Sequence, residues 1–358
     1  MKQPTDICPF ASLYSTLQDH PKWRLEWMTG WNPAGERGER IMEKRRLGNS
    51  DLYTAPIVFG GNVFGWTADK KQSFELLDAF FDLGFNAIDT ADVYSRWVEG
   101  NEGGESETII GTWMKKRGNR NKVLVITKVG SDMGQGKIDL SKDYILEAVD
   151  RSLERLQTDY LDLYLTHWDD EVTPVEETLE AYGKLIEAGK IRWAGASNLS
   201  PRRLKASLDA GKKDGGLPAY EVFQPEYNLY AREGFEQTVA PVCEEYGLGV
   251  ITYYSLASGF LSGKYRSEKD LSKSPRGDKV KEYLDSRGKR ILEALDEVSK
   301  EYNTTPAAVS LRWLMDRPGI TAPIASATKV EHLESFRAAV NLDLALESMD
   351  KLDEASRY

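Results

Sequence analysis

The ten residues Phe85–Tyr94 read FNAIDTADVY and join an apolar run to an acid and a tyrosine. The run FNAI has the length and composition of a buried strand, and Asp89 follows it where that strand should end. Two later runs end in the same way, since KVLVITK ends at Lys128 and LDLYLTH ends at His167. Catalytic side chains of an α/β barrel gather at the C-terminal ends of different strands. The pattern therefore predicts that these three residues and Tyr94 form one shared site.

The rest of the chain alternates between predicted strands and predicted helices. From Met42 onward, short β-branched runs alternate with longer amphipathic stretches, which is typical of βα units and a parallel sheet. Eight runs are predicted as strands, at residues 55–61, 85–90, 122–128, 161–167, 191–197, 221–228, 249–254 and 321–326. Eight parallel strands close into a barrel, so we expect an α/β fold of the (β/α)8 or TIM-barrel type. The run RRLGNSDLYTAPI (45–57) predicts a hairpin that caps the N-terminal end of the barrel.

Helix signals and two long loops fit this barrel. Helices are predicted over 73–84 and 141–157, the second with Ser141 as its cap, and Pro306 suits the first position of another helix. The stretches 95–106 and 255–287 are longer than ordinary turns. At the C-terminal face of a barrel, we expect loops of this length to cover a ligand.

The first 40 residues differ from the remainder. Trp23, Trp27 and Trp31 recur at a spacing that suits one face of a helix. Residues 1–40 are therefore predicted as an extension, and residues 41–358 as one barrel domain. The extension either packs on the outside of its own barrel or completes a neighbouring subunit, in which case the protein is a homo-oligomer.

Composition limits the partners and the compartment. A formal net charge of -10 and a pI of about 5.1 argue against nucleic acid or an anionic membrane as the main partner. The two cysteines, Cys8 and Cys243, form no metal-binding or disulfide pattern, which fits a reducing compartment. No signal peptide is apparent, and no run approaches the roughly 18 apolar residues of a membrane span. We therefore expect a cytoplasmic protein, without a metal site, that acts on a small molecule.

The four strand-end residues suit carbonyl reduction. This reaction needs a hydride on carbon and a proton on the developing alkoxide oxygen. Tyr94 can supply the proton if a cation lowers its pKa from about 10. Lys128 is that cation and Asp89 holds it in place, while neutral His167 orients the carbonyl oxygen. Each residue alone also has an ordinary structural explanation, and the prediction rests on their occurrence together.

Two other functions remain open at this point. A lysine at a strand end also serves lyases that form a Schiff base, so Lys128 could be a nucleophile. The chain could also be a sensor subunit that binds NADPH and turns over slowly.

The motifs DTADVY, ITK and LTH, followed by GGESETIIG after the first of them, resemble the aldo-keto reductase superfamily from about Met42 to the C-terminus. The resemblance implies a (β/α)8 barrel that reduces aldehydes or ketones with NADPH. It also implies that Asp89, Tyr94, Lys128 and His167 are the catalytic tetrad. The stretch DVYSRWVEGNEGGESETIIG looks most like bacterial members that act on sugars and related aldehydes.

The same resemblance implies a cofactor site. Its residues fall into three groups: Ser197, Asn198, Gln224 and Tyr253 at the nicotinamide; Leu256, Ser258, Gly259 and Lys264 at the pyrophosphate; and Ser326, Thr328, Lys329 and His332 near the adenosine 2′-phosphate. A hydroxyl and a cation at the 2′-phosphate favour NADPH over NADH. No GxGxxG motif follows the first strand, so a Rossmann-type site is not indicated.

Three positions depart from the family pattern at the adenine end, namely His332, Ser335 and Phe336. Relatives also often carry Ser-Pro where this chain has Tyr254 and Ser255. We expect an altered loop there without loss of catalysis.

The substrate pocket is predicted from aromatic residues that follow strand ends. Trp66, Trp97 and Trp168 can stack on the C–H faces of sugars or on flat aldehydes. Arg96 either binds an anionic group of the substrate or pairs with the glutamates of its own loop, which are Glu99, Glu102 and Glu105.

Overall fold

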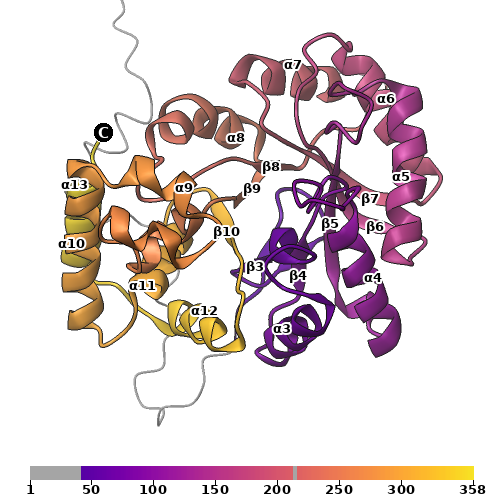
Figure 1. Cartoon of the computed structure of the whole chain (residues 1–358). Coiled ribbons are helices and arrows are strands. Elements are labelled where there is room, and N and C mark those ends of the chain that lie inside the picture. Colours follow the sequence, from indigo (N-terminus) through magenta and orange to yellow (C-terminus); the bar gives the residue numbers. More distant parts are fainter. Residues whose placement is uncertain (1–41, 213–215) are drawn as a thin grey trace, which may run out of the picture. The chain divides into compact units, whose positions relative to one another are not determined.

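A closed parallel barrel forms the centre of the computed structural model, which describes residues 42–212 and 216–358 (Figure 1). Its strands are β3 (Val58–Gly60), β4 (Ala87–Asp89), β5 (Leu124–Val129), β6 (Leu161–Thr166), β7 (Ile191–Ser197), β8 (Val222–Gln224), β9 (Gly249–Thr252) and β10 (Ile320–Ala325). They pair in the order β10-β3-β4-β5-β6-β7-β8-β9, each pair parallel. All eight predicted strands and the (β/α)8 fold are confirmed. The predicted extension 1–40 lies outside the described residues.

Helices surround the strands (Figure 1). They are α3 (Lys70–Asp82), α4 (Glu105–Arg117), α5 (Lys142–Leu156), α6 (Val175–Glu187), α7 (Pro201–Lys212), α8 (Ala240–Tyr246), α10 (Ser286–Glu301), α11 (Pro306–Met315), α12 (Leu333–Asn341) and α13 (Leu346–Ala355). No helix in the described part of the chain is long and apolar enough to cross a membrane.

Two predicted helix starts have different outcomes. Pro306 is the first residue of α11, and the Thr305 side chain accepts a hydrogen bond from the Ala308 N–H at 3.1 Å. Ser141 does stand at the cap position of α5, but its side chain makes no capping hydrogen bond. The Lys142 N–H donates instead to the Glu177 carboxylate at 3.1 Å. A neighbouring helix therefore supplies an acceptor at this helix start.

The predicted hairpin is present and lies at the N-terminal end of the barrel. Its strands are β1 (Arg45–Arg46) and β2 (Tyr53–Thr54), paired antiparallel. Leu47 and Leu52 are buried in the same apolar cluster as the inward-facing strand residues. Gly48 has φ +58°, and a Cβ there would lie 2.2 Å from the Glu221 carbonyl oxygen, so only glycine allows this close approach.

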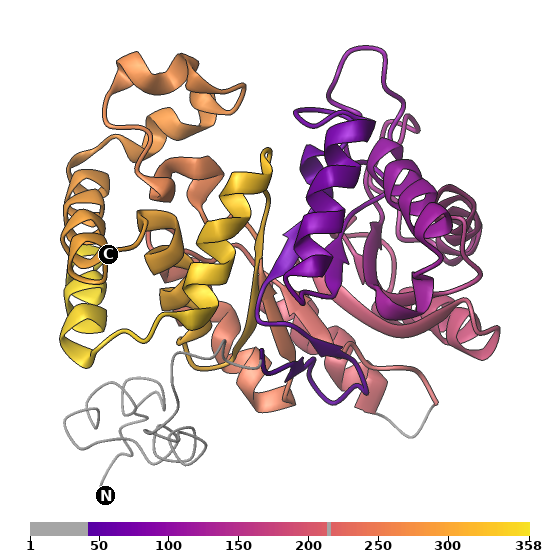
Figure 2. The same ribbon diagram turned by 90° about the horizontal axis from the view of Figure 1, so that it is seen from below.

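The long loop after β9 is folded rather than extended. It contains η4 (Ala257–Ser262), η5 (Glu268–Lys273), α9 (Gly277–Val280) and η6 (Lys281–Tyr283). Figure 2 shows this orange segment at the upper end of the barrel and the indigo hairpin at the lower end. The loop therefore stands at the face where the strands end, as predicted.

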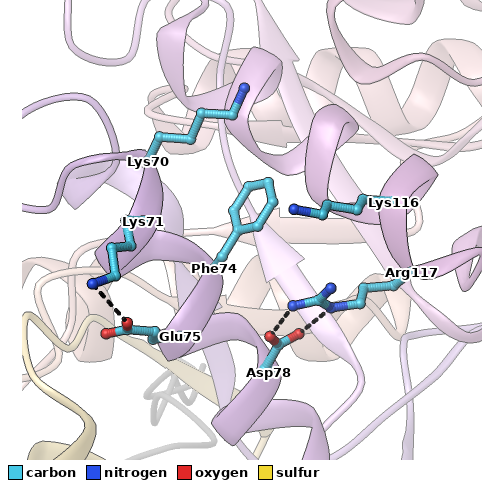
Figure 3. Close-up of a pocket in the computed structure, with 7 residues that line it drawn as sticks. All are labelled: Lys70, Lys71, Phe74, Glu75, Asp78, Lys116 and Arg117. Carbon is cyan, nitrogen blue, oxygen red and sulfur yellow. Dashed lines mark hydrogen bonds and ion pairs between the residues drawn. The ribbon is translucent and has the colours of Figure 1, made fainter.

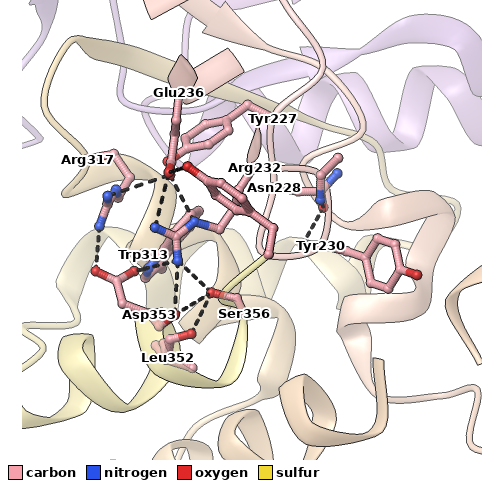
Figure 4. Close-up of polar contacts among 12 residues, drawn as sticks. Tyr227, Asn228, Tyr230, Arg232, Glu236, Trp313, Arg317, Leu352, Asp353 and Ser356 are labelled. Carbon is pink, nitrogen blue, oxygen red and sulfur yellow. Dashed lines mark hydrogen bonds and ion pairs between the residues drawn. The ribbon is translucent and has the colours of Figure 1, made fainter. Parts of the chain in front are cut away.

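A buried polar network attaches the last helix to the segment after β8 (Figure 4). The Arg232 side chain is 6% exposed and donates to Glu236 Oε1 at 2.9 Å and to Ser356 Oγ at 2.8 Å. Arg317 donates to Asp353 Oδ2 at 2.8 Å. These contacts bind α13 to the segment that follows β8.

Candidate active site

Strand alternation explains why polar side chains face the barrel interior at its upper end. Successive residues of a strand point to opposite faces, so a residue two places beyond a core residue faces the same way. Ala87 and Ile126 belong to the interior cluster, and Asp89 and Lys128 stand two places beyond them. Asp89 and Lys128 therefore lie directly above the apolar filling of the barrel.

The Lys128 ammonium group is completely buried and has three oxygen partners. Its Nζ lies 2.8 Å from Asp89 Oδ2, 2.7 Å from the Thr90 carbonyl oxygen and 3.0 Å from the Tyr94 hydroxyl. The Tyr94 hydroxyl in turn donates to Asp89 Oδ2 at 3.3 Å. Three of the four predicted catalytic residues are thus in direct contact.

One part of the sequence prediction was wrong. We expected Lys128 to bring the pKa of Tyr94 below its ordinary value, but burial raises that pKa well above this value, and the Asp89 carboxylate adds to the rise, despite the ammonium at 3.0 Å. Burial also lowers the pKa of Lys128, while Asp89 opposes this change. Tyr94 therefore keeps its proton at neutral pH in this arrangement.

His167 lies beside Tyr94 with its ring centre 6.0 Å from the tyrosine ring. Burial, followed by the charge of Lys128, holds the pKa of His167 well below its usual range. The imidazole is therefore expected to be neutral, with one ring N–H and one ring lone pair.

The predicted nicotinamide residues are hydrogen-bonded to the tetrad and to each other. Gln224 donates to Asp89 Oδ1 at 2.8 Å, and Asn198 donates to the His167 carbonyl oxygen at 2.9 Å. The Tyr253 hydroxyl donates to Asn198 Oδ1 at 2.7 Å. Ser197 donates to the Gln224 carbonyl oxygen at 2.7 Å. These four side chains therefore converge on the catalytic centre.

The predicted pyrophosphate segment is a left-handed turn. Ala257, Ser258 and Gly259 are consecutive residues with positive φ of 46°, 56° and 92°. Turns of this kind form concave arrangements of backbone N–H groups that bind anions. A Cβ on Gly259 would lie 3.1 Å from Lys264 Cε, so the lysine folds back over the turn. Two of its N–H groups are already used within the turn, because that of Ala257 donates to the Tyr254 carbonyl oxygen at 2.6 Å and that of Gly259 to the Leu256 carbonyl oxygen at 2.8 Å.

Cations gather at the predicted 2′-phosphate segment. Burial lowers the pKa of His332, and the charges of Lys264 and Lys329 lower it further, so both ammonium groups lie near this ring. The Thr328 N–H points to His332 Nδ1 at 3.4 Å. Ser326 is occupied by a hydrogen bond of 2.7 Å with the Asn62 side chain. These groups suit a bound phosphate.

Tryptophans surround the mouth above the tetrad. The Trp97 ring centre lies 5.6 Å from Trp66 and 6.0 Å from Tyr94, and Trp168 stacks on His167 at 5.8 Å. Trp97 and Trp168 are 50% and 43% exposed. Such an exposed aromatic cluster is typical of a binding surface.

A family model described as "Aldo/keto reductase family" matches residues 56–357. The chain belongs to the aldo/keto reductase family. Aldo-keto reductase YhdN of Bacillus subtilis (strain 168) is 33% identical over 285 residues, covering 78% of this chain and 81% of that protein. Aryl-alcohol dehydrogenase [NADP(+)] of Phanerodontia chrysosporium is 27% identical, covering 91% and 89%. A probable voltage-gated potassium channel subunit beta of Oryza sativa subsp. japonica is 32% identical, covering 87% and 96%. As a member of this family, the protein is an NAD(P)H-dependent oxidoreductase.

In this aldo/keto reductase, two of the three residues that depart from the family pattern at the adenine end contact other parts of the protein. Phe336 is 1% exposed, and its ring centre lies 6.4 Å from both Phe80 and Phe85, so it packs under α3 and is not available to a nucleotide. Ser335 is hydrogen-bonded to Thr305 at 3.0 Å, at the start of α11.

Arg96 does not pair with a glutamate of its own loop. Its Nη1 donates to the Asp132 carbonyl oxygen at 3.1 Å, in the loop after β5. Glu105 instead accepts from the N–H groups of Glu102 and Gly103, at 2.9 Å and 3.2 Å. Arg96 therefore joins the loops after β4 and β5 of this aldo/keto reductase.

Two residues of this site are absent from the sequence prediction. Arg276 extends from the loop after β9 to lie 5.1 Å over the Trp66 ring, and burial lowers the pKa of its guanidinium. It forms no ion pair within the described ranges, so it suits an anionic ligand. Ser131 lies 2.9 Å from His167 Nδ1. Ser131 follows the end of β5 closely, so a hydroxyl side chain after a strand end could have indicated it, whereas Arg276 stands far beyond β9 and has no such signal.

Two hollows on the surface do not contain the tetrad. One of about 460 Å³ lies between α3 and α4 and is lined by Lys70, Phe74, Asp78 and Lys116 among others (Figure 3). The other, of about 470 Å³, lies beside Asn198. Neither hollow is lined by a residue of the predicted tetrad, and the second adjoins the predicted nicotinamide residue Asn198.

Proposed function

We propose that this enzyme reduces an aldehyde or ketone to the alcohol with NADPH, and that Tyr94 donates the proton. One observation carries the proposal: the Tyr94 hydroxyl lies 3.0 Å from a fully buried lysine ammonium that Asp89 holds at 2.8 Å. A positioned phenol with an adjacent fixed cation is a general acid whose conjugate base is stabilised.

The residues of the mouth fit a nicotinamide dinucleotide. Amide and hydroxyl groups of Asn198 and Gln224 suit a carboxamide, and Tyr253 offers a ring for stacking. The left-handed turn at Gly259 and the cations Lys264 and Arg276 suit two phosphates. When bound, the reduced nicotinamide supplies the hydride to the carbonyl carbon.

The tetrad handles the proton and the developing charge. Because its pKa is raised, Tyr94 is protonated before reaction. As negative charge forms on the substrate oxygen, the phenol proton moves to that oxygen, and the Lys128 ammonium at 3.0 Å stabilises the phenolate left behind. Neutral His167 donates a hydrogen bond to the same oxygen and orients it.

The cations at the adenosine end support NADPH as the reductant. Lys264 and Lys329 both act on His332, so their charges add where a 2′-phosphate would bring negative charge. The relative from Phanerodontia chrysosporium carries NADP(+) in its name. NADH lacks that phosphate and should bind less tightly.

The substrate that we propose is a sugar or a related carbonyl compound. Trp97 and Trp168 present exposed faces that can stack on the C–H side of a sugar ring. The same faces suit an aryl aldehyde, and one relative is named for aryl alcohols. A panel of aldoses and substituted benzaldehydes at equal concentration tests the choice, since a higher kcat/KM for the benzaldehydes would reject the sugar.

Replacement of Tyr94 by Phe tests the acid directly. We expect aldehyde reduction to fall roughly 10²- to 10⁴-fold. NADPH binding, measured by quenching of protein fluorescence, should remain. Tyr53→Phe is the matched control, because Tyr53 is 52% exposed on the distant hairpin. Reduction by the Tyr94 variant at the wild-type rate would reject the assignment.

The rival Schiff-base lyase is disfavoured by the partners of Lys128. A Schiff base requires a neutral amine, whereas this ammonium donates to Asp89, the Thr90 carbonyl and Tyr94. Borohydride treatment with a keto substrate separates the two reactions. Covalent capture at Lys128 without nucleotide would favour the lyase.

A cofactor-binding sensor is the second candidate, because one relative is named as a channel subunit. Steady-state turnover across the aldehyde panel decides between them. Tight NADPH binding with turnover of every aldehyde below about 10⁻² per second, against a typical enzyme value of about 10, would favour the sensor.

A further inference from the structure

The His167 ring has a buried hydroxyl partner that does not belong to the tetrad. Ser131 Oγ lies 2.9 Å from His167 Nδ1, and the two residues are 4% and 8% exposed. Ser131 stands in the loop after β5, where its carbonyl oxygen accepts from Gln135 Nε2 at 3.0 Å. The hydroxyl is therefore held in place against the ring.

A neutral imidazole carries one proton, on either Nδ1 or Nε2, and the partner at one nitrogen determines which. Burial and Lys128 keep His167 neutral. A hydrogen bond from His167 to a substrate oxygen requires the proton on Nε2. If the proton were on Nδ1, the Nε2 lone pair would face the developing negative charge and oppose it.

We propose that Ser131 is a positioning residue that donates its hydroxyl proton to His167 Nδ1 and thereby holds the ring proton on Nε2, facing the substrate. The inference rests on the proposed reduction, because only that reaction needs a donor at this nitrogen.

Burial determines the direction of this hydrogen bond. If Nδ1 were the donor, the Ser131 hydroxyl hydrogen would have to find another acceptor, and within the described ranges its oxygen has only His167 as a partner. An unpaired buried donor is unfavourable. When Ser131 donates, both Nδ1 and the hydroxyl are satisfied and Nε2–H remains available.

The other contacts of His167 fix the position of the ring but do not determine its tautomer. Its N–H donates to the Val129 carbonyl oxygen at 2.8 Å, and its own carbonyl accepts from Asn198 at 2.9 Å. The Trp168 ring stacks on it at 5.8 Å. These contacts hold the backbone and the ring plane, whereas the proton position depends on Ser131.

The tautomer can be observed without any reaction. The chain has three histidines, so ¹⁵N-histidine labelling with a His167→Asn variant assigns the His167 signals in a long-range ¹H–¹⁵N spectrum. We expect the Nε2–H form in the wild type and a mixture of both forms in Ser131→Ala. A wild-type spectrum of the Nδ1–H form would overturn the proposal, whatever the enzyme reduces.

Kinetics test the consequence with a matched pair. Ser131→Thr keeps the hydroxyl, and Ser131→Val has the same shape without it. We expect kcat to fall roughly ten- to hundredfold in the Val variant relative to the Thr variant, with NADPH affinity unchanged. In a His167→Ala background the same pair should differ less than twofold. Equal kcat values for Thr and Val, or an equal gap in both backgrounds, would overturn the proposal.

The two failures are distinguishable. If the wild-type enzyme reduces no aldehyde, the proposed function is rejected, and the NMR spectrum still tests whether Ser131 sets the tautomer of His167. An active wild type with an unaffected Val variant rejects only the role of Ser131.

Discussion

Asp92 has a buried carboxyl group in an environment that disfavours its ionised form. The residue is 2% exposed, and within residues 42–212 and 216–358 its carboxyl oxygens form no well-aligned hydrogen bond, although the Val93 N–H lies close by. Burial, aided by the Glu107 carboxylate and opposed by Arg155, the Val93 N–H and Lys128, raises the pKa of Asp92 to about 8. We therefore expect Asp92 to be protonated in the folded protein at neutral pH and ionised in the unfolded chain.

This difference makes stability depend on pH in a defined direction. An unfolded aspartic acid has a pKa of about 3.9. At pH values between about 3.9 and about 8, the folded state therefore binds one proton more than the unfolded state. The free energy of unfolding therefore falls as pH rises through this window. Each pH unit contributes at most about 1.4 kcal/mol. Between pH 6 and pH 9 the loss from this group should be roughly 2 to 3 kcal/mol, levelling off above the folded pKa.

Asp92→Asn removes the titration and keeps the shape. The amide is as unpartnered as the acid, so any change in hydrogen bonding adds a constant offset at every pH. Urea unfolding at pH 6, 7, 8 and 9, followed by circular dichroism, gives the free energy of unfolding of both proteins. From pH 6 to pH 9, we expect the free energy of unfolding of the wild type to fall by roughly 2 to 3 kcal/mol relative to that of the variant.

An exposed aspartate supplies the control for this experiment. Asp143 lies on the exposed side of the first turn of α5, and Asp143→Asn should show no such shift. A difference for Asp92→Asn that stays constant within about 0.5 kcal/mol across the pH range would refute the reasoning. Asp92 would then ionise in the folded protein at ordinary pH.

Two further predictions concern the adenosine end and the core. Lys329→Ala should raise KM for NADPH roughly tenfold and leave KM for NADH unchanged, because one charge-assisted contact to a phosphate is lost; equal effects on both cofactors in steady-state assays would argue against a 2′-phosphate contact. Phe336→Ala should lower the free energy of unfolding by about 3 to 5 kcal/mol, since its ring packs on Phe80 and Phe85. Urea unfolding measures the loss, and kcat of the folded enzyme at low temperature should stay within twofold; a large fall in kcat would place Phe336 in the site.

The parts of the site that stand on strands were predictable from local pattern. Strand alternation places Asp89, Lys128 and Gln224 above the inward residues of their strands, and this periodicity is visible in the sequence. The barrel then brings the strand ends together. Residue type and spacing were sufficient for these positions because the backbone of a strand leaves a side chain only two directions.

Loop residues were not predictable in the same way. Arg276 stands 24 residues beyond Thr252, the last residue of β9, and reaches Trp66 only because the loop folds into short helical turns. Phe336 was placed at the adenine end by resemblance, yet α12 turns it into the core. A loop or helix face admits many directions, so the sequence leaves such contacts open until the packing is known.

The direction of the Tyr94 pKa could not be read from residue types, because it depends on how deeply the phenol is buried. The lysine and the aspartate are both in contact with the hydroxyl, and burial followed by Asp89 raises the pKa. Both carboxylate oxygens of Asp89 are occupied, Oδ1 by Gln224 and Oδ2 by Lys128 and Tyr94. For the phenol to turn its hydrogen to a substrate it must leave Oδ2, which Lys128 continues to satisfy. In the proposed reaction, an oxygen of the substrate must therefore compete with Asp89 Oδ2 for the Tyr94 hydroxyl hydrogen.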